Sequence, residues 1–276
     1  MKEKVLRTAL APGQVALFYL GQVGFLIKWN DKYLLIDGYL SDYVDRNCCS
    51  EQVQWVRNYP APIKAEELDF VDYVFCTHTH YDHADPDTLS ALARINSKAK
   101  YIVSAANVSA ISAYGIKNSD ILGLHADCCT TLEEGIAVTA IPAAHEEFHL
   151  DENGDYKEVG FRIALGDVTL FHAGDGCPYT GLAERLAGCD VLMLPINGRD
   201  YFRTVICDII GCFDAREAVL LAREVNAPLL IPTHFDLYDC NCVNPACFVD
   251  TLKALHPTQQ FHIFAPGERY IFAKDK

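Results

Sequence analysis

The chain carries its densest group of possible metal ligands in the stretch Thr77-His78-Thr79-His80-Tyr81-Asp82-His83. The run before it, 71–76, is rich in β-branched and aromatic residues and predicts a buried strand. The segment after it, 86–95, predicts a helix, with Asp85 as its N-cap and Pro86 as its first residue. The stretch is therefore expected in a loop at the carboxyl end of a strand.

The spacing of the histidines in this loop indicates a metal site. His78 and His80 are alternate residues, so an extended chain directs both imidazoles to the same side, where they can reach one ion. Asp82 and His83 follow where the chain turns, and they can face a second ion beside the first. A solvated loop without a ligand is the alternative, but three histidines and an aspartate within six residues favour metal binding.

The composition limits the kinds of partner that the protein can have. The 276 residues include 23 Lys and Arg against 37 Asp and Glu, which gives a formal net charge of −14. This deficit of basic residues argues against binding to nucleic acid and against docking on an anionic membrane. Half of the residues are hydrophobic, so the chain can bury a large core. Composition thus leaves a soluble, acidic, well-packed globular protein as the expectation.

The cysteines and the absence of targeting signals predict where the protein works. No apolar run approaches the length of a membrane span, and Pro12 and Gly13 interrupt any signal-peptide core. A cytoplasmic location is therefore expected, with most of the 12 cysteines as free thiols. Three cysteines stand in apolar stretches and are expected to be buried: Cys76, Cys189 and Cys207.

Short apolar runs separated by turn residues predict about twelve strands. Their ranges are 15–20, 24–29, 33–36, 71–76, 101–104, 136–141, 159–164, 168–172, 191–195, 229–232, 260–264 and 270–272. Asn30-Asp31 and Gly166-Asp167 are hairpin signals. Helices are predicted over 86–95, 105–114, 214–225 and 248–255, the third with a capping box of Asp214 and Glu217.

This order of elements predicts the architecture. Early hairpins followed by strand–helix alternation imply mixed sheets covered by helices, and so many strands suggest two sheets packed together in four layers. No repeat or linker divides the chain, so we expect a single domain over residues 1–276.

The loop also resembles a known family. His78, His80, Asp82 and His83 match the H-x-H-x-D-H signature of the metallo-β-lactamase fold superfamily without a gap. The resemblance implies an α/β fold of four layers, a αββα sandwich. It also implies further ligands at later strand ends, and the chain has them in the family's order: His145, Asp175 and His234. Asp37 matches the early aspartate that supports the metal loop.

Three further stretches, 19–25, 194–199 and 232–234, look like the UlaG-like branch, which is named for L-ascorbate-6-phosphate lactonase. This resemblance implies two divalent metal ions, Mn²⁺, Zn²⁺ or Fe²⁺, with manganese slightly favoured. One ion would be bound by His78, His80 and His145, and the other by Asp82, His83 and His234, with Asp175 as the bridge. Related enzymes commonly associate, so a homo-oligomer is also expected.

The resemblance further implies a hydrolase. Two ions held together lower the pKa of a bridging water, and the resulting hydroxide would open the carbonyl of a lactone or ester. Asp82 is the expected proton relay to the leaving alkoxide. Arg199 and Arg203 lie in the loop 197–203 and are expected to bind a phosphate or carboxylate of a small anionic, sugar-derived substrate, together with Asn197. Ordinary surface ion pairs are the alternative for both arginines.

Other functions remain as alternatives. Flavodiiron redox proteins share this fold, but their motif has a glutamate where this chain has His80. A phosphodiesterase or nuclease of the same fold would need a basic groove. The stretch 145–149 spells H-E-x-x-H, a zinc-protease motif that works only within a helix, whereas Pro142 and an acidic, turn-rich loop flank it here. A polar loop contains three thiols without a C-x-x-C pair, so free thiols are favoured there over a structural metal site or a thiol sensor: Cys240, Cys242 and Cys247.

Overall fold

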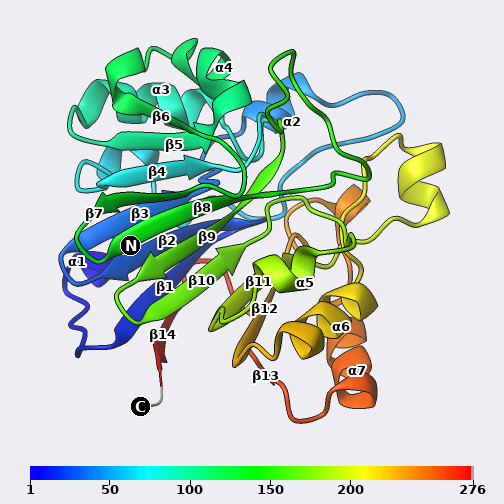
Figure 1. The fold of residues 1–276 in the computed structure, drawn as a ribbon. Coiled ribbons are helices and arrows are strands. Elements are labelled where there is room, and N and C mark those ends of the chain that lie inside the picture. The colour runs from blue at the N-terminus through cyan, green and yellow to red at the C-terminus, as the bar shows by residue number, and fades with distance from the viewer. Residues whose placement is uncertain (275–276) are drawn as a thin grey trace.

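The computed structural model describes residues 1–274 and shows two sheets of seven strands each (Figure 1). The first sheet starts with the hairpin that Asn30 and Asp31 predict, where Asn30 adopts a left-handed φ of 50°. It then continues with parallel strands, and its order is β14-β1-β2-β3-β4-β5-β6. Its strands are β1 Gln14–Gly21, β2 Gly24–Trp29, β3 Lys32–Ile36, β4 Tyr73–Cys76, β5 Lys100–Ser104, β6 Ile121–Leu124 and β14 Arg269–Ala273.

The second sheet repeats this plan, with antiparallel strands first and parallel strands afterwards. Its order is β13-β12-β11-β10-β9-β8-β7. Gly166 and Asp167 form the turn of its central hairpin, as predicted. Its strands are β7 Cys129–Glu133, β8 Ile136–Pro142, β9 Val159–Leu165, β10 Val168–His172, β11 Val191–Pro195, β12 Leu229–Thr233 and β13 Gln260–Phe261.

Both faces of the sheets are buried, which explains the nearly continuous apolar runs in the sequence. In β1, Leu17 and Tyr19 point into the core between the two sheets, whereas Phe18 and Leu20 point to the helical side. This alternation is the period of two that a strand imposes on its side chains. A strand covered on both faces therefore needs apolar residues at every position.

Helices cover the outer face of each sheet, with α3 and α4 on one side and α5, α6 and α7 on the other (Figure 1). Asp85 caps α3 by accepting a hydrogen bond from the backbone N–H of Asp87, and Asp214 and Glu217 form the predicted capping box of α6. The helices are α1 Lys2–Leu6, α2 Tyr43–Asn47, α3 Pro86–Ile95, α4 Val108–Ser112, α5 Leu182–Arg185, α6 Ala215–Val225 and α7 Pro245–Leu255. The four-layer αββα sandwich is thereby confirmed.

Several element boundaries differ from the prediction. The helix expected over 105–114 is a 3₁₀ turn followed by the short α4, and α7 starts at Pro245 because Asn244 caps it. The strands β6 and β7 were not predicted; β7 contains no fully buried residue and so lacks an apolar run. Cys76 and Cys189 are buried as expected, but Cys207 is only half-buried. All twelve cysteines lie among the described residues and are free.

Among residues 1–274, no helix has both the length and the apolar character needed to cross a membrane. The assignment of the chain to a single domain stays a prediction.

Candidate metal centre

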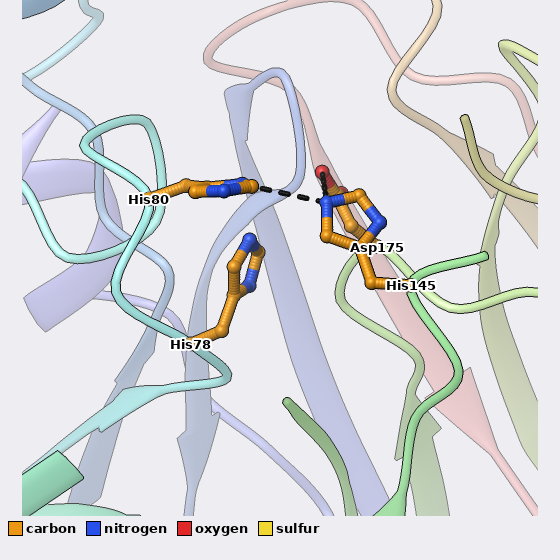
Figure 2. Close-up of side chains that lie close together, drawn as sticks. All are labelled: His78, His80, His145 and Asp175. Carbon is orange, nitrogen blue, oxygen red and sulfur yellow. Dashed lines mark hydrogen bonds and ion pairs between the residues drawn. The ribbon is translucent and has the colours of Figure 1, made fainter. Parts of the chain in front are cut away.

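The predicted ligands come together at the edge where strands of both sheets end. The loop 77–85 follows β4 of the first sheet, and three strands of the second sheet end at the same place. They are β8, β10 and β12, which lead to His145, Asp175 and His234. Figure 2 shows His78, His80, His145 and Asp175 turned toward a common point. The carboxyl ends of strands are where α/β folds commonly place their functional groups.

The seven side chains fall into two groups. His78, His80, His145 and Asp175 each offer one ligand atom, and these atoms lie within 4.8 Å of one another. The same holds for the second group, formed by Asp82, His83 and His234. This division is the one that the family resemblance implied.

Asp175 lies between the two groups. Its Oδ1 is 3.1 Å from His83 Nε2, and its Oδ2 is 3.4 Å from His234 Nε2 and 3.9 Å from His145 Nε2. Both oxygens therefore lie near the second group, and Oδ2 also lies near His145 of the first, so this carboxylate can reach an ion in either group.

The donor atoms of this site fit a metal ion. Within residues 1–274, His78 Nε2, His83 Nε2 and Asp175 Oδ1 are buried and have no hydrogen-bond partner. Buried polar atoms are almost always paired, because an unpaired one costs about 1–3 kcal/mol. Two unpaired imidazole nitrogens and an unpaired carboxylate oxygen within the two groups therefore point to a bound cation, and imidazole and carboxylate suit Zn²⁺, Mn²⁺ and Fe²⁺.

Asp37, which the family resemblance placed beside the loop 77–85, contacts that loop directly. It is fully buried and has a φ of 45°, and its Oδ2 accepts a hydrogen bond of 2.8 Å from His83 Nδ1. Its two oxygens also accept from the backbone N–H of Thr77 at 2.8 Å and from the Thr77 hydroxyl at 2.7 Å. The hydrogen bond from His83 Nδ1 to Asp37 Oδ2 fixes the orientation of the imidazole and leaves its Nε2 facing the site.

Charge and burial give the histidines different proton affinities. Burial lowers the pKa of His145 to about 4, and burial together with His83 and His80 lowers the pKa of His78. Burial also acts to lower the pKa of His83, but the carboxylates of Asp175 and Asp82 outweigh it and raise that pKa well above its usual value. A cation in the second group has to displace this proton.

Sequence reasoning missed three residues of the site. Gln22 Nε2 donates a 2.9 Å hydrogen bond to Asp82 Oδ2 and lies 3.0 Å from His234 Nε2. The buried His172 bonds through Nε2 to the carbonyl oxygen of Val23 at 2.7 Å, and its Nδ1 lies 3.9 Å from Asp37 Oδ2. Cys212 forms a third close group with Asp175 and His234. Gln22 and Cys212 come from segments distant in sequence from the residues that they approach, so no spacing pattern could reveal them.

The structure does not bring the predicted substrate-binding residues to the site. Arg199 Nη1 donates to Glu217 Oε2 at 2.9 Å and to the carbonyl oxygen of Cys212 at 2.6 Å. Arg203 and Asn197 both bond to Asn241 Oδ1, at 3.1 Å and 3.2 Å. Arg199, Arg203 and Asn197 are not among the residues that line the cavity over the metal ligands. The substrate-binding role stays a prediction for all three residues, and these pairings argue against it.

A cavity of about 420 Å³ opens over the two groups. Its floor contains His80, Asp82, His145, Asp175 and His234, and its remaining lining consists of Val44, Cys48, Trp55, Thr79, Tyr81, Asp208, Ile209, Ile210, Tyr238 and Asn241. The volume is in the range typical of sites for small ligands.

The two motifs weighed as alternatives do not form metal sites of their own. The stretch 145–149 is not helical, and His149 Nδ1 instead lies 3.2 Å from Glu158 Oε2. Within the described residues, Cys240, Cys242 and Cys247 do not belong to any group close enough to share an ion.

Comparisons with known proteins agree with this geometry. Residues 33–235 match the family described as Beta-lactamase superfamily domain. A "UPF0173 metal-dependent hydrolase" of Caldivirga maquilingensis is 26% identical over 256 residues, covering 91% of this chain and 96% of the relative. A protein of the same name from Methanosphaerula palustris is 30% identical over 175 residues, covering 60% of this chain and 69% of the relative.

A solved structure shows the same fold. It is described as a possible metal-dependent hydrolase from Veillonella parvula and superposes with a TM-score of 0.74, at 16% identity, covering 92% of this chain and 98% of that one. The chain therefore belongs to the beta-lactamase superfamily and, within it, to the UPF0173 metal-dependent hydrolases.

Proposed function

We propose that the protein is a hydrolase that uses two divalent metal ions to open a lactone or another carboxylic ester. The observation that carries the proposal is the division of seven candidate ligands, of which only His80 is exposed, into two neighbouring groups with Asp175 between them. The relatives named metal-dependent hydrolases support the hydrolytic chemistry. The resemblance of the sequence to the UlaG-like branch supports the choice of a lactone.

The protein's own residues hold the reactants and move the proton. Bound divalent ions would supply Lewis acidity and an acidified water at neutral pH. Asp82 lines the cavity, and its side chain is 18% exposed, so it can reach a leaving alkoxide and give it a proton. Gln22 fixes the orientation of this carboxylate through its bond to Oδ2. The ester C–O bond breaks as the water oxygen bonds to the carbonyl carbon, which gives an acid and an alcohol.

The metals are part of the proposal. Five imidazoles and two carboxylates suit Mn²⁺, Zn²⁺ or Fe²⁺, and we place Mn²⁺ first because of the resemblance. Purified protein should contain close to two ions per chain by elemental analysis. A content below one ion would contradict the two-metal site.

Activity provides the second test. Metal-depleted protein should lose hydrolysis of a panel of lactones and aryl esters and recover it with Mn²⁺ or Zn²⁺. His80→Ala and Asp82→Ala should abolish activity, whereas His125→Ala is the control, since His125 is exposed and pairs with Asp155. Full activity in both site variants, or none in the reconstituted wild-type protein on any ester, would overturn the proposal.

A further inference from the structure

The wall of the cavity differs in character from its floor. Four of the side chains above the metal ligands are apolar: Val44, Trp55, Ile209 and Ile210. Tyr81 and Tyr238 add two aromatic rings to the lining. Within residues 1–274, no lysine or arginine lines this cavity. An anionic group on the substrate would therefore depend on the bound metal ions for attraction, and not on a lysine or arginine.

The charges near the cavity also disfavour an anion. Asp208, which is exposed, adds a carboxylate to the lining, and the whole chain has a net charge of −14. The two arginines that the sequence suggested for anion binding pair with carboxylates instead, Arg199 with Glu217 and Arg203 with Asp200. Like charge in and around a cleft lowers the local concentration of an anionic ligand.

A segment that we call the flap, residues 200–210, contributes part of the apolar wall. It contains a π-helical turn, Phe202–Ile206, which stands out from the body of the domain as the yellow turn in Figure 1. Ile209 and Ile210 at its end line the cavity. Its other large apolar side chains are exposed: Tyr201 by 70%, Phe202 by 56%, Val205 by 59% and Ile206 by 52%. Apolar surface of this kind beside a pocket commonly marks a binding site.

We propose that the substrate is a neutral lactone or ester with an apolar alkyl or aryl group. Trp55, Ile209 and Ile210 hold this group, and the carbonyl lies over the metal-binding side chains. The inference rests on the proposed hydrolase function and replaces the anionic, sugar-derived substrate that Arg199 and Arg203 suggested. It makes Ile209 and Ile210, at the cavity end of the flap, determinants of specificity.

A matched series of lactones tests the substrate class. Five-membered lactones with methyl, butyl and hexyl side chains are compared with one whose side chain ends in a carboxylate, on the metal-loaded enzyme. The value of kcat/KM should rise about fourfold for each added methylene until the cavity is filled. The carboxylate should lower it at least tenfold. An equal or higher value for the carboxylate would overturn the inference and leave the hydrolase function standing.

A pair of charge variants tests the role of the flap. Ile210→Arg places a guanidinium in the cavity lining, whereas Val205→Arg makes the same change on the flap at a residue that does not line the cavity. Ile210→Arg should lower kcat/KM for the hexyl lactone about tenfold and raise it for the carboxylate by a similar factor. Val205→Arg should change neither. Equal effects of the two variants would contradict a specificity role for the cavity wall.

Binding separates the substrate class from the chemistry. Lactams with the same side chains are not readily hydrolysed, so they measure binding alone. Trp55 in the cavity lining provides a fluorescence signal for this binding. The Trp55→Phe variant shows how much of the signal comes from Trp29. The hexyl lactam should bind at least tenfold more tightly than its carboxylate analogue. If the enzyme hydrolyses no ester but this order holds, the proposed function fails and the inferred ligand class survives. The reverse order overturns the inference.

Discussion

The metal-binding loop, 77–85, and the flap both follow a strand, yet they are built in opposite ways. In the loop, His78 is 3% exposed and His83 is 1% exposed, and the fully buried Asp37 holds His83 through a direct hydrogen bond. In the flap, Tyr201 is 70% exposed and Val205 is 59% exposed. The loop is thus fixed by buried polar bonds, while much of the apolar surface of the flap contacts only solvent.

This difference separates two tasks. Metal ligands must be held in one geometry by the groups around them, whereas an apolar binding wall tolerates shifts because the hydrophobic effect has no direction. Changes around the loop should therefore affect metal binding and all substrates alike. Changes at the flap residues that line the cavity, such as Ile210, should alter which substrate is preferred.

The largest effect is expected for Asp175→Asn, which removes the carboxylate that lies between the two groups. The neutral amide loses the charge that faces His83 and His234, so metal content should fall below one ion per chain and kcat should drop roughly a thousandfold or more. Elemental analysis and steady-state kinetics measure both. The control is Asp127→Asn, since Asp127 pairs with Arg185 at the surface. Retention of two ions in Asp175→Asn would refute the bridging role.

A smaller effect is expected for Asp37→Asn, which weakens the support of the loop while leaving every ligand in place. Metal affinity should fall about 10- to 100-fold, because the carboxylate no longer fixes the His83 tautomer. Competition with a chelator measures this affinity. Asp72→Asn is the matched control, since Asp72 also accepts a backbone N–H, that of Tyr33, without touching a ligand. Unchanged affinity in Asp37→Asn would show that the hydrogen bond does not position the imidazole.

The effect of Gln22→Leu should be smaller than that of Asp37→Asn, because the substitution removes a neutral hydrogen-bond donor to Asp82 rather than a charged group. We expect a loss of roughly tenfold in kcat/KM for neutral and anionic substrates alike, since about 1.5 kcal/mol, the lower end of the range for a hydrogen bond to a charged group, corresponds to about a tenfold change. Gln259→Leu is the control: its buried amide bonds only to backbone carbonyls, so it should lower stability and leave metal binding intact. A change in substrate preference in Gln22→Leu would contradict the separation of metal binding by the loop from substrate preference at the flap.

The smallest effect is expected for Arg199→Ala. The Arg199–Glu217 pair is part-exposed, at 30% and 24% of the side chains, so its loss should cost about 1 kcal/mol and lower Tm by a few degrees. Melting curves and the KM for a carboxylate-bearing lactone decide between the two roles of this residue. A KM raised tenfold at unchanged stability would restore the substrate-binding role predicted from the sequence.

The sequence predicted the fold and the ligands because both depend on local patterns. The stretch 77–83 combines ligand spacing with a strand before it and a capped helix after it, and each feature is visible within a few residues. The capping box of Asp214 and Glu217 and the turns at Asn30 and Gly166 are equally local, and the structure contains them.

The remaining features depend on contacts that a linear pattern does not contain. The partner of Arg199 is Glu217, eighteen residues away in the next helix, so its guanidinium could not be known to be occupied. Gln22 lies sixty residues from the Asp82 that it holds. The strand β7 escaped prediction because its position at the edge of its sheet requires no apolar run.

The pairing of β14 with β1 has a consequence for synthesis of the protein. Residues 14–18 complete their hydrogen bonds only with residues 269–273, near the opposite end of the chain. At about 5–20 residues per second on the ribosome, β14 emerges roughly ten to fifty seconds after β1. Until then β1 has an open edge, and open strand edges pair with other chains. Ending translation before residue 269 should therefore send nascent chains into aggregates even though every metal ligand has already been made.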